Sequence, residues 1–256
     1  MKKFNIYMMI LLCATVLISC EKNAVQDITG DPPQSMIKFF NFGVNAPPVN
    51  FYANDTKMTA VSSVTGVESL LGVGYGSVGS GGYYSAIIPG QYTLKGKIAA
   101  EIDKDLAISN IAGTIETGKS YSVYQSGFFN ATDKTVDGFI IEDQLPALDT
   151  GKAYVRFVNA ISNSNPMTLY AKNTLTSEEI AVGSDVAYKA GGAFTALPNG
   201  VYNLSTRYAG SATNVISRLS VSFSKGRVYT IGSRGDITIV STTLVNRPFL
   251  DNTLNR

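Results

Sequence analysis

The stretch Ile37-Lys-Phe-Phe-Asn41 occurs a second time, slightly changed, as Val155-Arg-Phe-Val-Asn159. A second pair of blocks follows at the same distance downstream of each copy, where Val49-Asn-Phe-Tyr-Ala53 aligns with Met167-Thr-Leu-Tyr-Ala171. Self-similar blocks in one order are the signature of a repeated structural unit. The folded part of the chain is therefore predicted to be a duplication.

Two later pairs of blocks extend this repeat. Pro89-Gly-Gln-Tyr-Thr-Leu94 matches Pro198-Asn-Gly-Val-Tyr-Asn-Leu204 with one extra turn residue, and Gly118-Lys-Ser-Tyr-Ser-Val123 matches Gly226-Arg-Val-Tyr-Thr-Ile231. Proline followed by glycine suits tight turns, and the residues after it alternate with the period of a strand. No segment after the N-terminal region carries a helical stripe of apolar residues.

These patterns predict an all-β protein made of two tandem immunoglobulin-like β-sandwich domains. The repeat places the first domain at residues 35–146 and the second at residues 147–256, with a proline-containing joint around Leu145 to Lys152. A chain of 256 residues is long enough for two such domains. Its 24 Gly, 14 Tyr and 12 Phe favour short strands and turns over helices.

The repeated blocks resemble a known bacterial family, domain of unknown function 4397. The resemblance rests on Arg156-Phe-Val-Asn-Ala160, Leu197-Pro-Asn-Gly-Val-Tyr202 and the Gly-x-x-Tyr blocks, and it covers both halves. It implies tandem β-sandwiches on an exported or lipid-anchored protein, and it implies no catalytic residue. The first block departs from the family's usual Arg-Val-Val-His, because here it is Lys38-Phe-Phe-Asn41.

The N-terminus carries an export signal. A short basic segment precedes the apolar run Met8–Ile18, which is too short to span a bilayer, and Leu17-Ile-Ser-Cys20 resembles the bacterial lipobox. Residues 1–19 are thus predicted to be a lipoprotein signal peptide, Cys20 to carry diacylglycerol and palmitate, and residues 20–34 to be a flexible tether. An ordinary secretory signal with an incidental Cys20 is the alternative.

This signal peptide and lipobox predict a cell-envelope protein that is lipid-anchored to a membrane, with the outer membrane or cell surface favoured. The sequence leaves the membrane and the leaflet open, because one acidic residue after the cysteine does not decide between them.

Composition excludes several chemistries. The chain has no His and no Trp, and its two cysteines, Cys13 and Cys20, both lie in the signal region. Nucleophiles paired with histidine, disulfides and the commonest zinc ligand are therefore missing from the folded part. The net charge of +2 falls to zero once Lys2 and Lys3 leave with the signal, so nucleic acid is not an expected partner. No cofactor and no catalytic residue is predicted.

The segment Gly113-Thr-Ile-Glu-Thr-Gly-Lys119-Ser120 matches the phosphate-loop pattern in every position. A working phosphate loop needs a helix after it, because the N-H groups of the helix N-terminus hold the phosphates. Tyr-Ser-Val-Tyr follows here, which predicts a strand. We therefore expect a turn before a strand, and no nucleotide partner.

Gly74-Tyr-Gly-Ser-Val-Gly79 fits the dinucleotide fingerprint, with Glu101 near the expected acidic position. Tyr83-Tyr-Ser-Ala-Ile-Ile88 reads as a strand where that site needs a helix. A flexible hairpin loop is the favoured interpretation.

Glu101, Asp103 and Asp105 alternate, so on a strand their carboxylates would share one face. Such a row is a weak Ca²⁺ candidate. A solvated loop or strand edge is the alternative, and it is favoured.

Five aromatic residues near glycine-rich turns are candidate ligand contacts, since aromatic faces on loops suit sugars and protein partners. The alternative is that half of them point into a core. They are Tyr75, Tyr83, Tyr84, Phe128 and Phe129.

Two functions follow. The leading hypothesis is a non-enzymatic, membrane-anchored binding or structural module for a glycan or envelope protein. The alternative is a carboxylate-based hydrolase acting on envelope or extracellular polysaccharide, which needs two facing carboxylates and no histidine.

Overall fold

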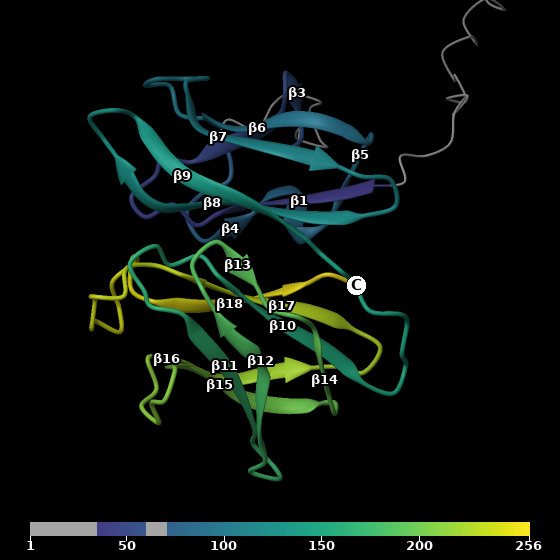
Figure 1. The fold of residues 1–256 in the computed structure, drawn as a ribbon. Coiled ribbons are helices and arrows are strands. Elements are labelled where there is room, and N and C mark those ends of the chain that lie inside the picture. Colours follow the sequence, from purple (N-terminus) through teal and green to yellow (C-terminus); the bar gives the residue numbers. More distant parts are fainter. Residues whose placement is uncertain (1–34, 60–70) are drawn as a thin grey trace, which may run out of the picture. The chain divides into compact units, whose positions relative to one another are not determined.

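The computed structural model describes residues 35–59 and 71–256, and these belong to one compact unit. They form two β-sandwiches, as the sequence predicts, and the two are stacked on each other (Figure 1). The described residues contain no α-helix, and none of their helical segments is long and apolar enough to cross a membrane. The predicted signal peptide 1–19, lipidation site Cys20 and tether 20–34 lie outside the described residues.

Each sandwich consists of two sheets. In the first sandwich, one sheet has the order β4-β1-β8-β9 with β5 also paired to β1, and the other has the order β3-β2-β6-β7. A short 3-10 turn, η1 (Gly79–Gly82), separates β4 from β5. The strands are β1 (Ser35–Asn41), β2 (Val49–Ala53), β3 (Thr56–Lys57), β4 (Ser77–Val78), β5 (Ser85–Ile87), β6 (Gly90–Ile98), β7 (Ala107–Ile115), β8 (Ser120–Asn130) and β9 (Thr135–Glu142).

The second sandwich repeats this topology. Its sheets have the orders β13-β10-β17-β18, with β14 also paired to β10, and β12-β11-β15-β16. In both copies the first strand runs parallel to the strand that opens with the Gly-x-x-Tyr block, β1 beside β8 and β10 beside β17. The strands are β10 (Ala153–Asn159), β11 (Met167–Asn173), β12 (Glu179–Val186), β13 (Ala190–Gly191), β14 (Thr195–Leu197), β15 (Gly200–Tyr208), β16 (Ile216–Phe223), β17 (Val228–Arg234) and β18 (Phe249–Leu254).

The repeated asparagine has the same structural task in both copies. Asn41 and Asn159 end β1 and β10 and are fully buried. Each side-chain oxygen accepts the backbone N-H two residues on, from Gly43 at 3.3 Å and from Ile161 at 3.0 Å. A buried amide needs such partners, because an unpaired one costs about 1–3 kcal/mol. The repeat therefore preserves the turn that leaves the first strand.

The repeated tyrosines also act alike. Tyr92 and Tyr202 donate their hydroxyls to backbone carbonyls four residues upstream, at 2.8 and 2.7 Å. Tyr121 and Tyr229 each accept a backbone N-H from five residues upstream, at 3.1 Å in both cases. These contacts resemble the tyrosine corner of immunoglobulin-like sandwiches, in which a phenol ties a strand to the preceding turn.

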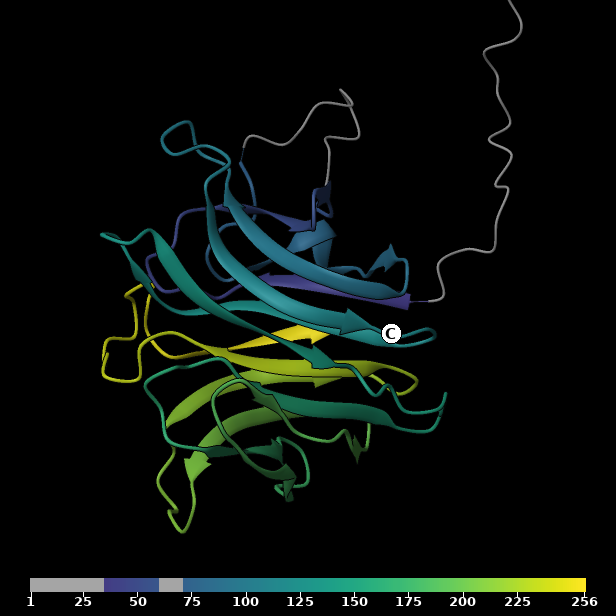
Figure 2. The ribbon, with the colours of Figure 1, turned by 45° about the horizontal axis from the view of Figure 1, so that its top comes forward.

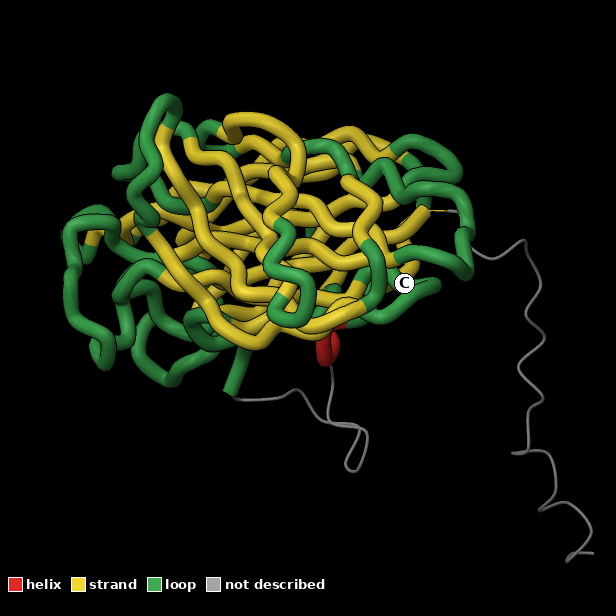
Figure 3. Tube along the Cα trace, turned by 90° about the horizontal axis from the view of Figure 1, so that it is seen from below, coloured by secondary structure: helices red, strands yellow, loops and turns green. Residues whose placement is uncertain are grey.

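The sheets lie in layers one above another (Figure 2), and strands joined by loops make up nearly all of the described chain (Figure 3). Apolar side chains fill three layers between the four sheets. Two of these layers are the cores of the sandwiches, and they contain Phe39 and Phe51 in the first and Phe157 and Phe223 in the second. The third lies where the β4-β1-β8-β9 sheet faces the β13-β10-β17-β18 sheet. We call this contact the junction, and it positions Lys38, Arg156 and Asp143, which are described below.

Candidate functional site

Stacked aromatic rings form the centre of the junction. Tyr124 stacks on Phe40 and Phe139 with ring centres 4.4 and 5.0 Å apart, and Val158 and Ala160 of the second sandwich complete the cluster. Aromatic pairs at such distances add about 0.5–1.5 kcal/mol beyond the area they bury. The outer faces of the two sheets are thus apolar at their centre, which explains why the sandwiches pack together.

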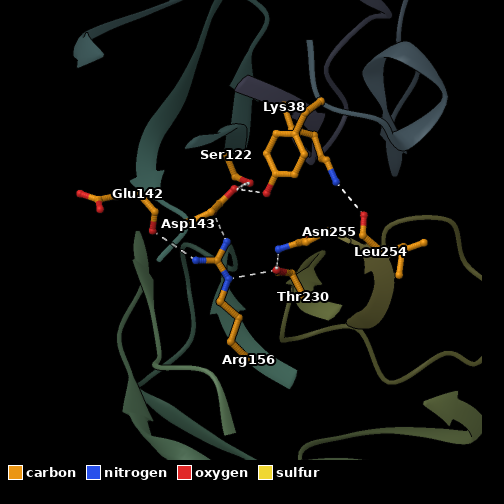
Figure 4. A network of polar contacts seen from close by, with 9 residues as sticks. Lys38, Ser122, Glu142, Asp143, Arg156, Thr230, Leu254 and Asn255 are labelled. Carbon is orange, nitrogen blue, oxygen red and sulfur yellow. Dashed lines mark hydrogen bonds and ion pairs between the residues drawn. The ribbon is translucent and has the colours of Figure 1, made fainter. Parts of the chain in front are cut away.

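Polar residues lie beside this apolar centre, and they follow the repeat (Figure 4). Lys38 on β1 and Arg156 on β10 occupy matching positions, and they are 1% and 2% exposed. Lys38 Nζ donates to the carbonyl of Leu254 at 2.8 Å, while Arg156 Nη1 donates to the carbonyl of Glu142 at 3.3 Å. Each cation therefore reaches the last residue of the other sandwich's edge strand, β18 or β9.

Each cation also lies against an aromatic ring from the residue just before a short strand. Lys38 Nζ is 4.2 Å from the centre of the Tyr84 ring, and the Arg156 guanidinium is 4.9 Å from the centre of the Phe194 ring. Tyr84 precedes β5 and Phe194 precedes β14. Such cation–π contacts contribute about 0.5–2 kcal/mol, more where water is excluded. We call these two sets of contacts the Lys38 corner and the Arg156 corner of the junction, and their contacts correspond.

The corners differ in one residue. Asp143, which follows β9, is 3% exposed and forms an ion pair with the Arg156 guanidinium. It also accepts hydrogen bonds from Ser122 Oγ at 2.7 Å and from the Tyr84 hydroxyl at 2.6 Å. The residue that follows β18 is Asn255, whose amide donates to Thr230 Oγ1 at 2.9 Å. A buried carboxylate therefore stands at one corner and a neutral amide at the other.

This difference affects the ionisation of the corner residues. Burial lowers the pKa of Lys38 to about 8; the Asp143 carboxylate opposes this shift and the Arg156 charge adds to it. Burial also raises the pKa of Tyr84, and the neighbouring Asp143 charge raises it further. Tyr84 is therefore a neutral hydrogen-bond donor at physiological pH.

Two grooves open at the junction. The larger, of about 850 Å³, lies between the two sandwiches, with Lys38, Tyr83 and Tyr84 on one side and Arg227, Thr253 and Arg256 on the other. We call it the large groove. The smaller, of about 470 Å³, includes Arg156, Glu142 and Phe194. Ligand sites usually measure about 300–1,000 Å³, so both fall in that range.

The five aromatic candidates from the sequence do not form one cluster. Tyr83, 76% exposed, and Tyr84 line the large groove. Tyr75 lies instead against Arg234, with the guanidinium 4.8 Å from its ring centre. At the far end of β8, Phe128 is 44% exposed and Phe129 packs against the core of the first sandwich. The structure thus brings two of the five to a groove.

The row of carboxylates lies in the loop between β6 and β7, as the favoured alternative has it. Glu101, Asp103 and Asp105 do not share a strand face, because the turn gives Asp103 and Asp105 positive φ angles of 58° and 64°. Asp103 pairs with Lys134 at 2.9 Å. Within residues 35–59 and 71–256, no group of three or more acidic, His or Cys side chains is arranged to hold a metal ion.

The phosphate-loop-like segment leads into a strand, as predicted. Gly118 has a φ of +77°, which favours glycine, and β8 begins at Ser120. Lys119 is paired with two carboxylates, at 2.8 Å from Glu116 and 3.0 Å from Glu142. The local geometry therefore lacks the helix N-terminus that a phosphate loop uses.

The dinucleotide-like segment is likewise a connection between strands. It contains β4 and runs into η1, and the strand expected at Tyr83–Ile88 is shorter, with only β5 (Ser85–Ile87) paired. The expected strand was therefore too long. Tyr84 lies just outside the paired strand, and its side chain contacts Lys38 and Asp143 in the junction.

Lys38, Arg156 and Asp143 were not among the residues predicted to form a site. One signal was present: a basic residue stands at the same place in both copies, between apolar residues on a strand. Strand alternation puts that residue on the face opposite the core. A cation repeated there, followed two residues later on the same face by an apolar residue, Phe40 or Val158, indicates an outer face that is itself covered.

Comparisons with known proteins identify the family of this chain. A search of the curated proteins found no match. A solved structure of the C-terminal domain of AlgF from P. aeruginosa is similar at 18% identity over 41% of this chain and 99% of that one, with a TM-score of 0.28. The family model described as Domain of unknown function (DUF4397) matches twice, over residues 35–170 and 153–253. Because the two matches cover most of the chain, this protein belongs to the DUF4397 family.

Proposed function

We propose that this chain is a lipid-anchored, non-enzymatic binding module of the bacterial cell envelope that holds a glycan between its two sandwiches. The lipobox-like stretch ending at Cys20 supports the anchor. The large groove supports the binding role. It is built from both repeats, so a ligand in it contacts two units whose relative position is fixed by the junction.

The large groove is the observation that carries the proposal. It offers the exposed ring of Tyr83, hydroxyl and amide groups from Ser77 and Asn255, and apolar surface from Met36. A concave site with apolar walls and a few polar groups is the usual form of a small-molecule or sugar site. A sugar chain, which has both apolar faces and many hydroxyls, fits this mixture well.

Binding is better supported than carboxylate-based hydrolysis. None of the residues that line the large groove is an Asp or a Glu. Hydrolysis of a glycosidic bond by carboxylates needs two of them about 5–10 Å apart. The small groove contains Glu142, but this carboxylate is paired with Lys119.

Binding is tested with the purified full-length chain on a glycan array that holds neutral and acidic oligosaccharides. We expect binding that Tyr83→Ala reduces at least tenfold, because the variant removes the exposed ring, and that Phe128→Ala, a matched exposed aromatic, leaves unchanged. Absence of any glycan binding at millimolar concentration, together with capture of an envelope protein, would replace the glycan by a protein partner.

The anchor is tested separately. We expect metabolic labelling with palmitate to tag the wild-type protein and not Cys20→Ser. Label retained by Cys20→Ser would show that the lipid is attached elsewhere.

A further inference from the structure

The charged side chains that line the large groove are all positive. Lys38 lies in its wall, and Arg227 and Arg256 are exposed beside it. No carboxylate side chain lines it. Grooves lined by one sign of charge concentrate ligands of the opposite sign.

Lys38 is the most unusual of these cations. Its ammonium is buried, yet in the part of the chain that the structure describes it forms no ion pair, only the 2.8 Å hydrogen bond to the Leu254 carbonyl and the contact with Tyr84. At the matching corner, Arg156 is neutralised by Asp143. Buried charges are normally paired, because removing them from water is costly. The buried residues Lys38, Arg156 and Asp143 therefore carry two positive charges and one negative charge, which leaves a net charge of +1 beside the large groove.

The surroundings strengthen the effect of this charge on a ligand. Water screens buried charges less than exposed ones, so an anion in the groove would be attracted even without touching the ammonium. Burial lowers the pKa of Lys38, and the nearby Asp143 carboxylate opposes this shift only in part.

We infer that the large groove binds a sugar chain that carries anionic groups, with its negative charges directed to Lys38 and Arg227 and a sugar face against Tyr83. This rests on the proposed function, since it specifies the ligand class of the same groove. The shared chemistry is the anionic sugar, and its charge comes either from uronate carboxylates or from sulfate esters.

The inference is tested by calorimetric titration of the full-length protein with four probes of similar length. They are an oligogalacturonate, a sulfated oligosaccharide, a neutral cello-oligosaccharide and a poly-glutamate peptide. We expect one or both anionic sugars to bind at least tenfold more tightly than the neutral sugar and the peptide. The binding should weaken as salt rises from 50 to 500 mM, because screening acts on exposed charges such as Arg227.

Variants assign this binding to the groove. We expect Arg227→Ala and Lys38→Met each to weaken binding of the anionic sugar about tenfold, and Lys104→Ala, an exposed lysine in the β6–β7 loop, to leave it unchanged. Arg227 is exposed, so its variant is expected to fold normally and keeps the test valid if Lys38→Met does not.

The outcomes separate the inference from the proposed function. Equal binding of neutral and anionic sugars, lost in Tyr83→Ala, would overturn the inference and leave the glycan-binding function standing. Preference for the peptide over every sugar would overturn both. Tight binding of the anionic sugar that neither Arg227→Ala nor Lys38→Met weakens would place the ligand elsewhere and overturn the inference.

Discussion

The two corners of the junction began as copies of one position and now differ in charge balance. At the Arg156 corner the cation meets Asp143, so its charge is neutralised. At the Lys38 corner a neutral Asn255 stands where Asp143 stands in the other copy, and the groove beside it is larger. The comparison teaches that duplication supplied the same scaffold twice. The one carboxylate, Asp143, forms an ion pair with Arg156 and leaves Lys38 without one, and the inferred anion site rests on this difference.

Removing the carboxylate of the Arg156 corner should have the largest effect. Asp143→Ala leaves the Arg156 guanidinium buried without a counter-charge, so we expect a loss of about 3–5 kcal/mol in the free energy of unfolding. Urea titration followed by circular dichroism measures it. Asp55→Ala, at an almost fully exposed carboxylate, is the control and should change stability by less than about 0.5 kcal/mol. A loss below about 1 kcal/mol for Asp143→Ala would mean that the pair does not hold the junction.

Removing the Lys38 cation should not lower the free energy of unfolding. Lys38→Met replaces an unpaired buried ammonium with an apolar side chain of similar length, so we expect unchanged or increased stability at pH 7, by up to about 2 kcal/mol. The same urea titration applies, with Arg156→Met as the matched variant that should destabilise. A large loss in Lys38→Met would contradict the contrast between the corners.

The pH dependence of stability tests whether the pKa of Lys38 is lowered in the folded protein. Because the pKa of Lys38 is about 8 in the folded protein and near 10.5 in the unfolded chain, the unfolded chain binds more protons between these values. Wild-type stability should therefore rise from pH 8 to pH 10 relative to Lys38→Met, by on the order of 2 kcal/mol. Asp143, Arg156 and Tyr84, the ionisable groups around Lys38, are retained in the variant, so the difference isolates the lysine. A flat difference between pH 8 and pH 10 would show that Lys38 titrates normally.

The smallest effect should come where the two copies are alike. Tyr121 and Tyr229 make the same 3.1 Å hydrogen bond to an upstream N-H, so Tyr121→Phe and Tyr229→Phe should each cost about 1 kcal/mol. Thermal unfolding of both variants measures the pair. Values that differ by more than about 1 kcal/mol would show that the copies have diverged at the turns as well as at the junction.

Much of the fold could be predicted because its signals are local. Period-two alternation, the Pro-Gly turns and the glycine before Tyr121 and Tyr229 each act within a few residues, and each indicates a strand or turn. One prediction of a strand was too long. Pairing before Pro89 begins only at Ser85, and Tyr84 contacts Lys38 and Asp143, which are distant in the sequence and so gave no local signal.

The candidate site was predicted only in part. Of the aromatic candidates, Tyr83 and Tyr84 line the large groove, and glycine-rich neighbours were a correct indication for them. Phe128 and Tyr75 had the same kind of neighbours, yet they lie elsewhere. Glycine-rich neighbours indicate that a side chain lies in a turn near the surface. They do not indicate which part of the folded chain that side chain will contact.

The sequence by itself determined that the chain is a duplicated all-β unit, because alternation and turns depend on neighbouring residues. Only the tertiary structure decided that the outer faces of two sheets cover each other, that Lys38 and Arg156 are buried there, and that one corner keeps a groove. The physical reason is that alternation tells which side of a sheet a residue takes. What lies against that side depends on the packing of strands more than a hundred residues apart.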